Sequence, residues 1–330
     1  PKQVSKVYRY VRDGPVPCQM PAVRVDNPGP AGPQQVLAEV DARWWGFWQH
    51  APQTLHTERW FEVFDGFPAF PEIAPLAEHT VSSVLRAAPA AKAAGRDGWT
   101  YGDLKRLPQA ALGLLCVIFQ STECTGVWPE PIAHSFVAML PKGGSGTPDD
   151  FRPVVLLSVF YRPWAKCRGR EFQAFLRAAG VAPPGKSKSA EHLAFDLALR
   201  IAVAQAGGAS VSGLALDWSK CYDHLLLILL HHVAARLGIP DAIAKPMLAA
   251  YAQPRAVLLH GSIAPERRPS AGLAPGCPRA TDWLALLIFM YTSTLEAEVH
   301  NLRSRPYVDD ITSVVMTADS FEAVEAVTHM

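Results

Sequence analysis

The ten residues Leu214–Asp223, LALDWSKCYD, decide how this chain of 330 residues is interpreted. Apolar residues typical of a buried strand lead to a carboxylate at Asp217, and a helix start follows directly. Aspartate is also a common helix cap, so Asp217 taken alone could serve only to begin that helix. The stretch therefore predicts a strand that ends on a carboxylate, whose role depends on what else lies near it.

A second stretch, Tyr307–Val315, reads YVDDITSVV and predicts a β-hairpin with Asp309 and Asp310 at its turn. Aspartate is an ordinary turn residue. Two like charges at the tip of an apolar hairpin nevertheless repel each other unless a cation lies nearby. If Asp217 and Asp309 meet on adjacent strands, they form an oxygen site of the kind that Mg²⁺ prefers.

Two further features are weaker when each is taken alone. The stretch Gly272–Pro278, GLAPGCP, is a Gly/Pro loop that leads into an apolar helix, a usual way for a helix to begin. Between Pro141 and Ala190 there are nine basic and three acidic residues, a net charge of +6 in a chain whose net charge is +1. Such a block is either a solvated face or a surface for anions.

The pattern predicts an α+β fold in which residues 73–330 form the main domain and residues 1–72 a Pro-rich linker with a helical extension. Apolar spacing predicts helices over 34–48, 76–87, 103–125, 158–178, 190–206, 224–237, 241–252 and 277–298. It predicts strands over 132–140, 211–217 and 255–260 and on both sides of Val308–Asp310, with a small antiparallel sheet.

Several classes of protein are excluded by composition. No apolar run approaches the ~18 residues of a membrane helix, and no charged-then-apolar leader is present, so we expect no membrane association and no secretion signal. The six cysteines show no zinc-finger spacing, which favours reduced thiols in the nucleus or cytoplasm.

Together and in this order, the motifs resemble the reverse transcriptase of LINE-type (non-LTR) retrotransposons. Leu214–Asp223 is similar to that family's LDFSKAFD motif, and Tyr307–Asp310 to its YADD box. Residues 140–142 and 150–158, LPK and DFRPVVLLS, resemble its fingers signature, and Gly95–Gly98 resembles its GPDG element. The resemblance implies the fingers and palm of a right-hand polymerase, with fingers over about 90–205 and palm over about 206–330.

The resemblance implies RNA-directed DNA polymerisation with two Mg²⁺ ions, for which Mn²⁺ could substitute. It assigns catalysis and metal binding to Asp217, Asp309 and Asp310, with the carbonyl of Trp218 as a further ligand. Carboxylates suit this role because two divalent ions must be held close together to stabilise the attacking and leaving oxygens.

The same resemblance assigns dNTP binding to Lys142, Arg152, Tyr222 and Trp218. Cationic side chains are needed opposite a triphosphate. An aromatic ring at Tyr222 implies exclusion of the 2′-hydroxyl, which distinguishes ribonucleotides from deoxyribonucleotides.

The implied partners are an RNA template, a DNA primer and dNTPs. An endonuclease upstream in the same polyprotein is a further implied partner. Nucleic-acid contacts fall on Gly272, Pro275, Gly276, Arg162 and Lys166. Two other cations of the basic block, Arg168 and Arg170, could also face the template backbone.

The chain departs from the family at two places. Pro275 stands where the family's GLPQGCPLSP motif has glutamine, and a proline supplies neither an amide side chain nor a backbone N–H. The 20 residues after Asp310 contain no Lys or Arg and are too few for the family's thumb. Three alternatives therefore stand: an inactive relic that binds nucleic acid or a protein, an RNA-dependent RNA polymerase, and a helical scaffold without a nucleic-acid role.

Overall fold

The fold is taken from a computed structural model, which describes residues 32–50, 58–143, 147–181, 190–307 and 310–317. The chain divides into two compact units whose segments alternate along the sequence. Unit 1 comprises Pro1–Thr54, Glu72–Glu171 and Tyr222–Ala280, and unit 2 comprises Leu55–Pro71, Phe172–Cys221 and Thr281–Met330. The division thus differs from the contiguous fingers and palm expected from the sequence, and each unit is described by itself.

Unit 1 contains a four-stranded sheet with the order β2-β1-β4-β5. Its strands are β1 (Ser135–Pro141), β2 (Phe151–Leu156), β4 (Arg255–Leu259) and β5 (Ser262–Ile263). Strand β1 runs antiparallel to β2 and parallel to β4. The parallel pair was not expected from the sequence, and neither was β2. Because β2 is an edge strand, it tolerates Pro153, which lacks a backbone N–H.

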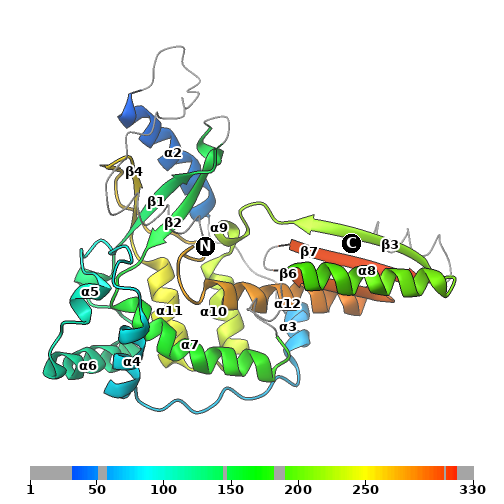
Figure 1. Ribbon diagram of the computed structural model, residues 1–330, viewed down its shortest axis with the longest axis horizontal. Coiled ribbons are helices and arrows are strands. Elements are labelled where there is room, and N and C mark those ends of the chain that lie inside the picture. The colour runs from blue at the N-terminus through cyan, green and yellow to red at the C-terminus, as the bar shows by residue number, and fades with distance from the viewer. Residues whose placement is uncertain (1–31, 51–57, 144–146, 182–189, 308–309, 318–330) are drawn as a thin grey trace. The chain divides into compact units, whose positions relative to one another are not determined.

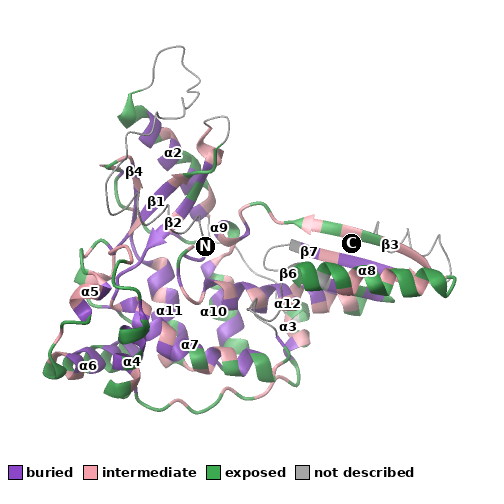
Figure 2. Cartoon of the chain, viewed as in Figure 1, coloured by how far each residue is buried: buried purple, intermediate pink, exposed green. Residues whose placement is uncertain are grey.

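Helix α2 (Pro33–Trp48) lies beside this sheet and contacts β4 and β5 (Figure 1). Its apolar residues recur every three or four positions, which is why the sequence predicts it. The helix buries Val36, Leu37, Val40 and its tryptophans Trp44, Trp45 and Trp48, as the buried colour of its inner face shows (Figure 2). The expected extension is therefore, from Pro33 to Trp48, an integral part of unit 1.

The other helices of unit 1 are mostly those that the sequence predicts. They are α4 (Glu78–Ala87), α5 (Tyr101–Leu104), α6 (Gln109–Thr125), α10 (Leu227–Arg236) and α11 (Asp241–Ala252). Helix α6 packs against α4 and α11, and α10 packs against α11. The prediction of one helix over 103–125 is wrong, because Pro108 stands as the N-cap of α6 and separates it from α5.

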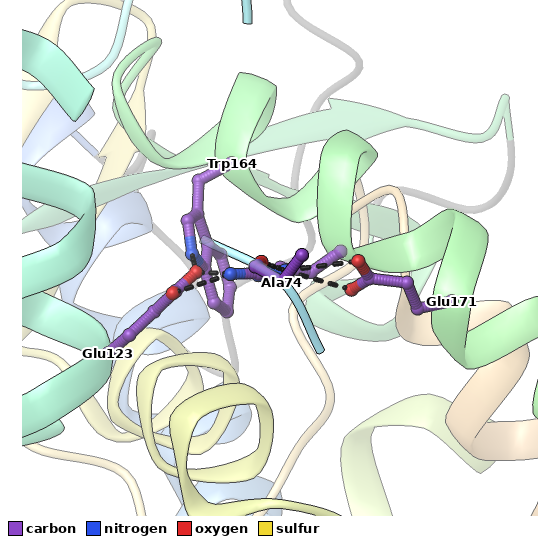
Figure 3. Close-up of polar contacts among 5 residues, drawn as sticks. Ala74, Glu123, Trp164 and Glu171 are labelled. Atoms are coloured by element: carbon purple, nitrogen blue, oxygen red, sulfur yellow. Dashed lines mark hydrogen bonds and ion pairs between the residues drawn. The ribbon is translucent and has the colours of Figure 1, made fainter. Parts of the chain in front are cut away.

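The part of helix α7 (Tyr161–Ala178) that belongs to unit 1 contains a buried ion pair (Figure 3). The guanidinium of Arg168, 1% exposed, donates to both carboxylate oxygens of Glu123 at 2.6 Å. It also donates to Glu171 at 3.0 Å and to the carbonyl of Ala74 at 2.9 Å. Trp164 donates its indole N–H to the same Glu123 at 2.7 Å. Burial of these charges is therefore compensated by a full set of hydrogen bonds.

Unit 2 contains a three-stranded antiparallel sheet with the order β3-β7-β6. Its strands are β3 (Ser210–Asp217), β6 (Leu302–Tyr307) and β7 (Asp310–Thr317). Helix α8 (Ala190–Ala206) lines a cavity with Arg303, Val314 and Met316. Leu302 of β6 and Val315 of β7 are each one position away from these strand residues, and they pack against Leu295 of α12 (Ala280–Glu298). Since successive strand residues point to opposite faces, the two helices cover opposite faces of the sheet.

A group of aromatic rings also packs within unit 2. Phe67 follows α3 (Glu58–Phe61) and the 3₁₀ helix η1 (Glu62–Phe64). The centroid of its ring lies 6.3 Å from that of Phe175 and 5.4 Å from that of Phe289. Phe172 of α7 packs against Trp283 of α12 at 5.1 Å. These rings, remote in sequence, fix the ends of α7 and α12 within the unit.

The α+β class predicted from the sequence is confirmed, with small sheets surrounded by helices. The sheet of unit 2 is antiparallel, as expected. Within the described residues, none of the helices combines the length and apolar character required to cross a bilayer.

Candidate active site

Two aspartates of unit 2 lie at opposite register positions on the adjacent strands β3 and β7. Asp217 is the last residue of β3 and Asp310 the first of β7, and the register of these strands pairs them directly. The same register pairs Asp310 with Tyr307 at the end of β6. The sequence predicts that Asp217 meets Asp309, but Asp309 and Val308 lie outside the described residues. The pairing that the structure places at this edge is therefore Asp217 with Asp310.

Asp217 is exposed at the strand end, and its carboxylate has no hydrogen bond or ion pair to any residue that the structure describes. The chain turns at once, with Lys220 in the left-handed region at a φ of 52°. An aspartate that caps a helix would accept backbone N–H groups of the first turn. The capping interpretation of Asp217 is thus not supported, and its oxygens remain available to a ligand.

Trp218 follows Asp217 and is half-buried, with its ring 5.0 Å from that of Tyr291. Its carbonyl, the further metal ligand in the sequence-based assignment, accepts a hydrogen bond from the backbone N–H of Cys221 at 3.0 Å. A carbonyl oxygen has two lone pairs, so one of them stays free for a second interaction.

Across the described residues, no three or more His, Cys, Asp and Glu side chains gather closely enough to hold a metal ion. Asp309, the third carboxylate of the predicted set, is outside that part of the chain. The donors that can be examined are the exposed carboxylate of Asp217 and one lone pair of the Trp218 carbonyl, and the strand register places Asp310 opposite Asp217. Hard oxygen donors of this kind fit Mg²⁺ or Mn²⁺ rather than a softer metal.

The predicted phosphate-binding cations lie on the β1–β2 hairpin of unit 1. The backbone N–H of Lys142 donates to the carbonyl of Asp150 at 2.7 Å, and Arg152 pairs with Leu140 two residues before Lys142. The two cations are therefore diagonal neighbours on one face of the hairpin. Both side chains are exposed.

The two acids beside these cations are already engaged elsewhere. Asp149 forms a two-pronged ion pair with Arg43 of α2 at 3.1 and 3.0 Å. Asp150 accepts the backbone N–H and the hydroxyl of Thr147 at 2.9 and 3.1 Å. Since no carboxylate in the described part of the chain pairs with Lys142 or Arg152, the hairpin presents unneutralised positive charge.

The Gly/Pro loop at 272–276 joins two of the other predicted segments. The N–H of Leu273 donates to the carbonyl of Tyr222 at 2.8 Å, and the N–H of Val155 on β2 donates to the carbonyl of Pro275 at 2.7 Å. A Cβ at Gly276, whose φ is 106°, would lie 2.9 Å from the carbonyl oxygen of Val155. The loop therefore lies directly against both the strand of Arg152 and the short helix α9 (Cys221–His224), which carries Tyr222.

Pro275 itself fits this arrangement. Its carbonyl is the group that binds β2, so the missing N–H of proline leaves no donor unused there. The amide side chain that the family has at this position is nevertheless absent, and Pro275 is half-buried.

Arg162 and Lys166 stand one turn apart on α7, beside Lys92. Arg162 donates to the carbonyl of Ala93 at 2.8 Å. Burial lowers the pKa of Lys92, and the positive charges of Lys166 and Arg162 lower it further. Among the described residues, Lys92 and Lys166 have no carboxylate partner, so this cluster of three like charges suits an anionic ligand.

Arg168, in contrast, does not face a template. The prediction that it could is wrong, because its side chain is buried in the ion pair with Glu123. Arg170 is exposed. Charge sign alone cannot separate a core arginine from a surface one, because an arginine can be buried when acids surround it.

Sequence reasoning missed three polar residues in the core of unit 1. Trp48 donates its indole N–H to the carboxylate of Asp223 at 2.8 Å, and Arg255 donates to the carbonyl of Gly272 at 3.1 Å. The signal available was the Asp223 that closes the LDFSKAFD-like motif and the arginine that begins an otherwise apolar strand.

The predicted site residues divide between the units. Asp217, Trp218 and Asp310 belong to unit 2. Unit 1 contains the other predicted substrate residues, which lie on the β1–β2 hairpin, on α9, in the Gly/Pro loop and on α7. Within unit 1 the structure brings together the segments of Arg152, Tyr222 and Pro275. Compared with known families, the chain is matched by no protein-family model.

Proposed function

We propose that this chain is the fingers and palm of a reverse-transcriptase-type polymerase, which transfers the nucleotidyl group of a dNTP to a primer 3′-hydroxyl on an RNA template and releases pyrophosphate. The observation that carries the proposal is the register of unit 2, in which Asp217 at the end of β3 lies opposite Asp310 at the start of β7. Two carboxylate positions opposite each other at one end of the sheet, with Asp309 directly before Asp310 in the sequence, suit a two-metal site.

In the proposed reaction the primer 3′-oxygen attacks the α-phosphorus of the dNTP, and pyrophosphate leaves. Asp217, Asp309, Asp310 and the Trp218 carbonyl would hold the two Mg²⁺ or Mn²⁺ ions. When bound, these ions stabilise charge on the attacking and leaving oxygens. Asp217 suits this part because its carboxylate is exposed and has no other partner in the described chain.

The cations of unit 1 would bind the rest of the substrate. Lys142 and Arg152 carry charge that no neighbouring acid neutralises, so they would meet the triphosphate. Arg162 and Lys166 would contact the phosphates of the RNA template or the DNA primer. Such substrates place the activity in the nucleus or the cytoplasm.

One observation favours a second candidate, a non-catalytic nucleic-acid-binding module. Pro275 replaces the glutamine with which the family contacts the nascent base pair, whereas the cationic surface of unit 1 is retained. Such a module would bind RNA with the salt dependence of phosphate contacts and would extend no primer.

Primer extension on an RNA template separates the two candidates. The chain is assayed with Mg²⁺ or Mn²⁺ and with dNTPs or rNTPs supplied separately, beside Asp309→Ala as the control for a contaminating polymerase. We expect extension with dNTPs that Asp309→Ala abolishes. Extension with rNTPs alone would favour an RNA polymerase, and RNA binding without any extension would favour the non-catalytic module.

Tyr222 gives a prediction of its own. We expect Tyr222→Ala to reduce the preference for dNTPs over rNTPs by about 10- to 100-fold, since removal of the ring leaves room for a 2′-hydroxyl. The preference is the ratio of kcat/KM for the two nucleotides on one template. Phe195→Ala, which removes a 70% exposed ring of α8, is the control and should leave this ratio unchanged. An unchanged ratio for Tyr222→Ala would contradict the assigned role.

A further inference from the structure

Three polar residues, Trp48, Asp223 and Arg255, form a cluster inside unit 1 that the proposed reaction does not use. Trp48 and Arg255 have no exposed surface, and Asp223 is 4% exposed. The indole Nε1 of Trp48 donates to Oδ1 of Asp223 at 2.8 Å, although the two residues lie 175 positions apart in the chain. The guanidinium of Arg255 lies over the ring of Trp48 at 5.9 Å.

Burial of these groups is incompletely compensated. Arg255 donates through Nη2 to the carbonyls of Tyr251 and Gly272, but its Nε and Nη1 have no hydrogen-bond partner among the described residues. Burial lowers the pKa of Arg255 to about 10, and the negative charge of Asp223 opposes that shift. Buried ionic groups often stabilise a fold less than apolar ones of the same size. Stability alone is therefore a poor reason for this cluster.

The cluster holds together two backbone segments that carry predicted substrate residues. The carbonyl of Trp48 accepts the N–H groups of Ser270 and Ala271 at 2.8 and 3.0 Å. The N–H of Gly272 donates to the carbonyl of Leu225 at 2.8 Å, three residues after Tyr222. A Cβ at Gly272, whose φ is 95°, would lie 3.0 Å from Cδ1 of Trp48, so the loop passes directly over the indole.

We propose that Trp48 is a positioning residue for Tyr222 and acts through Asp223. The inference rests on the proposed function, because it concerns the same nucleotide site. Tyr222 and Asp223 are consecutive, so the hydrogen bond from the Trp48 indole fixes the backbone that carries the Tyr222 ring. Arg255 fixes the opposing loop through the carbonyl of Gly272. The end of helix α2 thereby fixes how the segment of Tyr222 and the Gly/Pro loop are held against each other.

Trp48→Phe tests this role because it keeps an aromatic ring and removes the N–H donor. Trp45→Phe is the matched control: Trp45 is on the same helix and 3% exposed, and its Nε1 donates within the helix to Asp41 at 3.0 Å. We expect Trp48→Phe to raise the KM for dNTP or lower dNTP-over-rNTP preference by about 5- to 30-fold, with kcat within about threefold. Trp45→Phe should change neither quantity by more than about twofold.

Hydrogen exchange provides a readout that does not depend on polymerisation. In Trp48→Phe the amides of Gly272 and Leu273 should exchange at least about fivefold faster than in the parent chain, whereas Trp45→Phe should leave them unchanged. The proposal would be overturned if the two variants had equal effects on the KM for dNTP, on the dNTP-over-rNTP preference and on amide exchange. The effects of both variants would then reflect general loosening of α2.

The two proposals fail in different ways. If the parent chain extends no primer, the polymerase proposal fails and exchange alone decides: unchanged exchange in Trp48→Phe overturns the positioning role, and local acceleration supports it. If Trp48→Phe does not fold, Asp223→Ala takes its place, because it removes the oxygen that accepts the Trp48 N–H. Unchanged exchange at Gly272 and Leu273 in that variant would overturn the proposal equally.

Discussion

Asp217→Asn is expected to lower primer extension by about 1,000-fold or more while the protein stays folded. An amide has nearly the shape of a carboxylate but carries no charge, and the proposed metal site depends on that charge. Asp217 is exposed, and its carboxylate has no partner in the described chain, so its loss breaks no hydrogen bond of the fold. The free energy of unfolding should therefore change by less than about 0.5 kcal/mol. Single-turnover extension and urea denaturation measure the two quantities.

Asp196→Asn is the matched control for this prediction. Asp196 is another aspartate of unit 2, on α8, with a side chain that is 44% exposed, and it forms an ion pair with Arg200 at 2.9 Å. Its substitution should leave extension within about twofold of the parent rate. If Asp217→Asn retains the parent rate, the two-metal assignment is wrong. If it loses activity only because it unfolds, the denaturation curve will show it.

Arg168→Met is expected to have the largest effect on stability. The substitution leaves Glu123, whose side chain is 8% exposed, without the guanidinium that neutralises it. Removal of one partner of a buried ion pair lowers the free energy of unfolding by roughly 3–5 kcal/mol, because the remaining charge stays uncompensated. Urea denaturation followed by circular dichroism at 222 nm, a wavelength that reports about equally on all helices, measures this loss.

Two further variants separate charge from packing. Arg200→Met breaks an exposed ion pair of similar length and should change stability by less than about 0.5 kcal/mol. The double variant Arg168→Met/Glu123→Leu removes both buried charges and should recover a large part of the loss, since apolar replacements of a buried pair are often tolerated. A loss below about 1 kcal/mol in Arg168→Met would show that water reaches Glu123 and contradict the buried pair.

The parts of the fold that follow from periodicity could be predicted. The helices expected over 190–206 and 241–252 are α8 and α11 residue for residue, and the helix expected over 34–48 matches α2 within one residue, because their apolar spacing and end signals are clear. Strand β2 could not be predicted, because Pro153 lowers the strand tendency of a segment that is stable only as the edge of a sheet. The interleaving of the two units has no local signal at all.

The candidate site shows the same limit. Asp217 and Asp310 could be singled out because carboxylates interrupt apolar strands, but their register became known only from the pairing of β3 with β7. The bond between Trp48 and Asp223 joins segments 175 residues apart, and a single polar pair leaves no periodic pattern. The polymerase assignment and its metal ions remain predictions that rest on the motifs and on this register.

The three-segment composition of unit 1 has a consequence for synthesis of the chain on the ribosome. Helix α2 leaves the exit tunnel early, yet its partners around Asp223 and Ser270 belong to the last of the three segments. At about 5–20 residues per second, the 175 residues from Trp48 to Asp223 take roughly 9–35 s to translate. During that interval the indole of Trp48 lacks its native partner Asp223, whereas Trp44 can already bind the carbonyl of Pro148. The nascent protein should therefore depend on holdase chaperones, and a pause in translation before codon 280 should increase its aggregation.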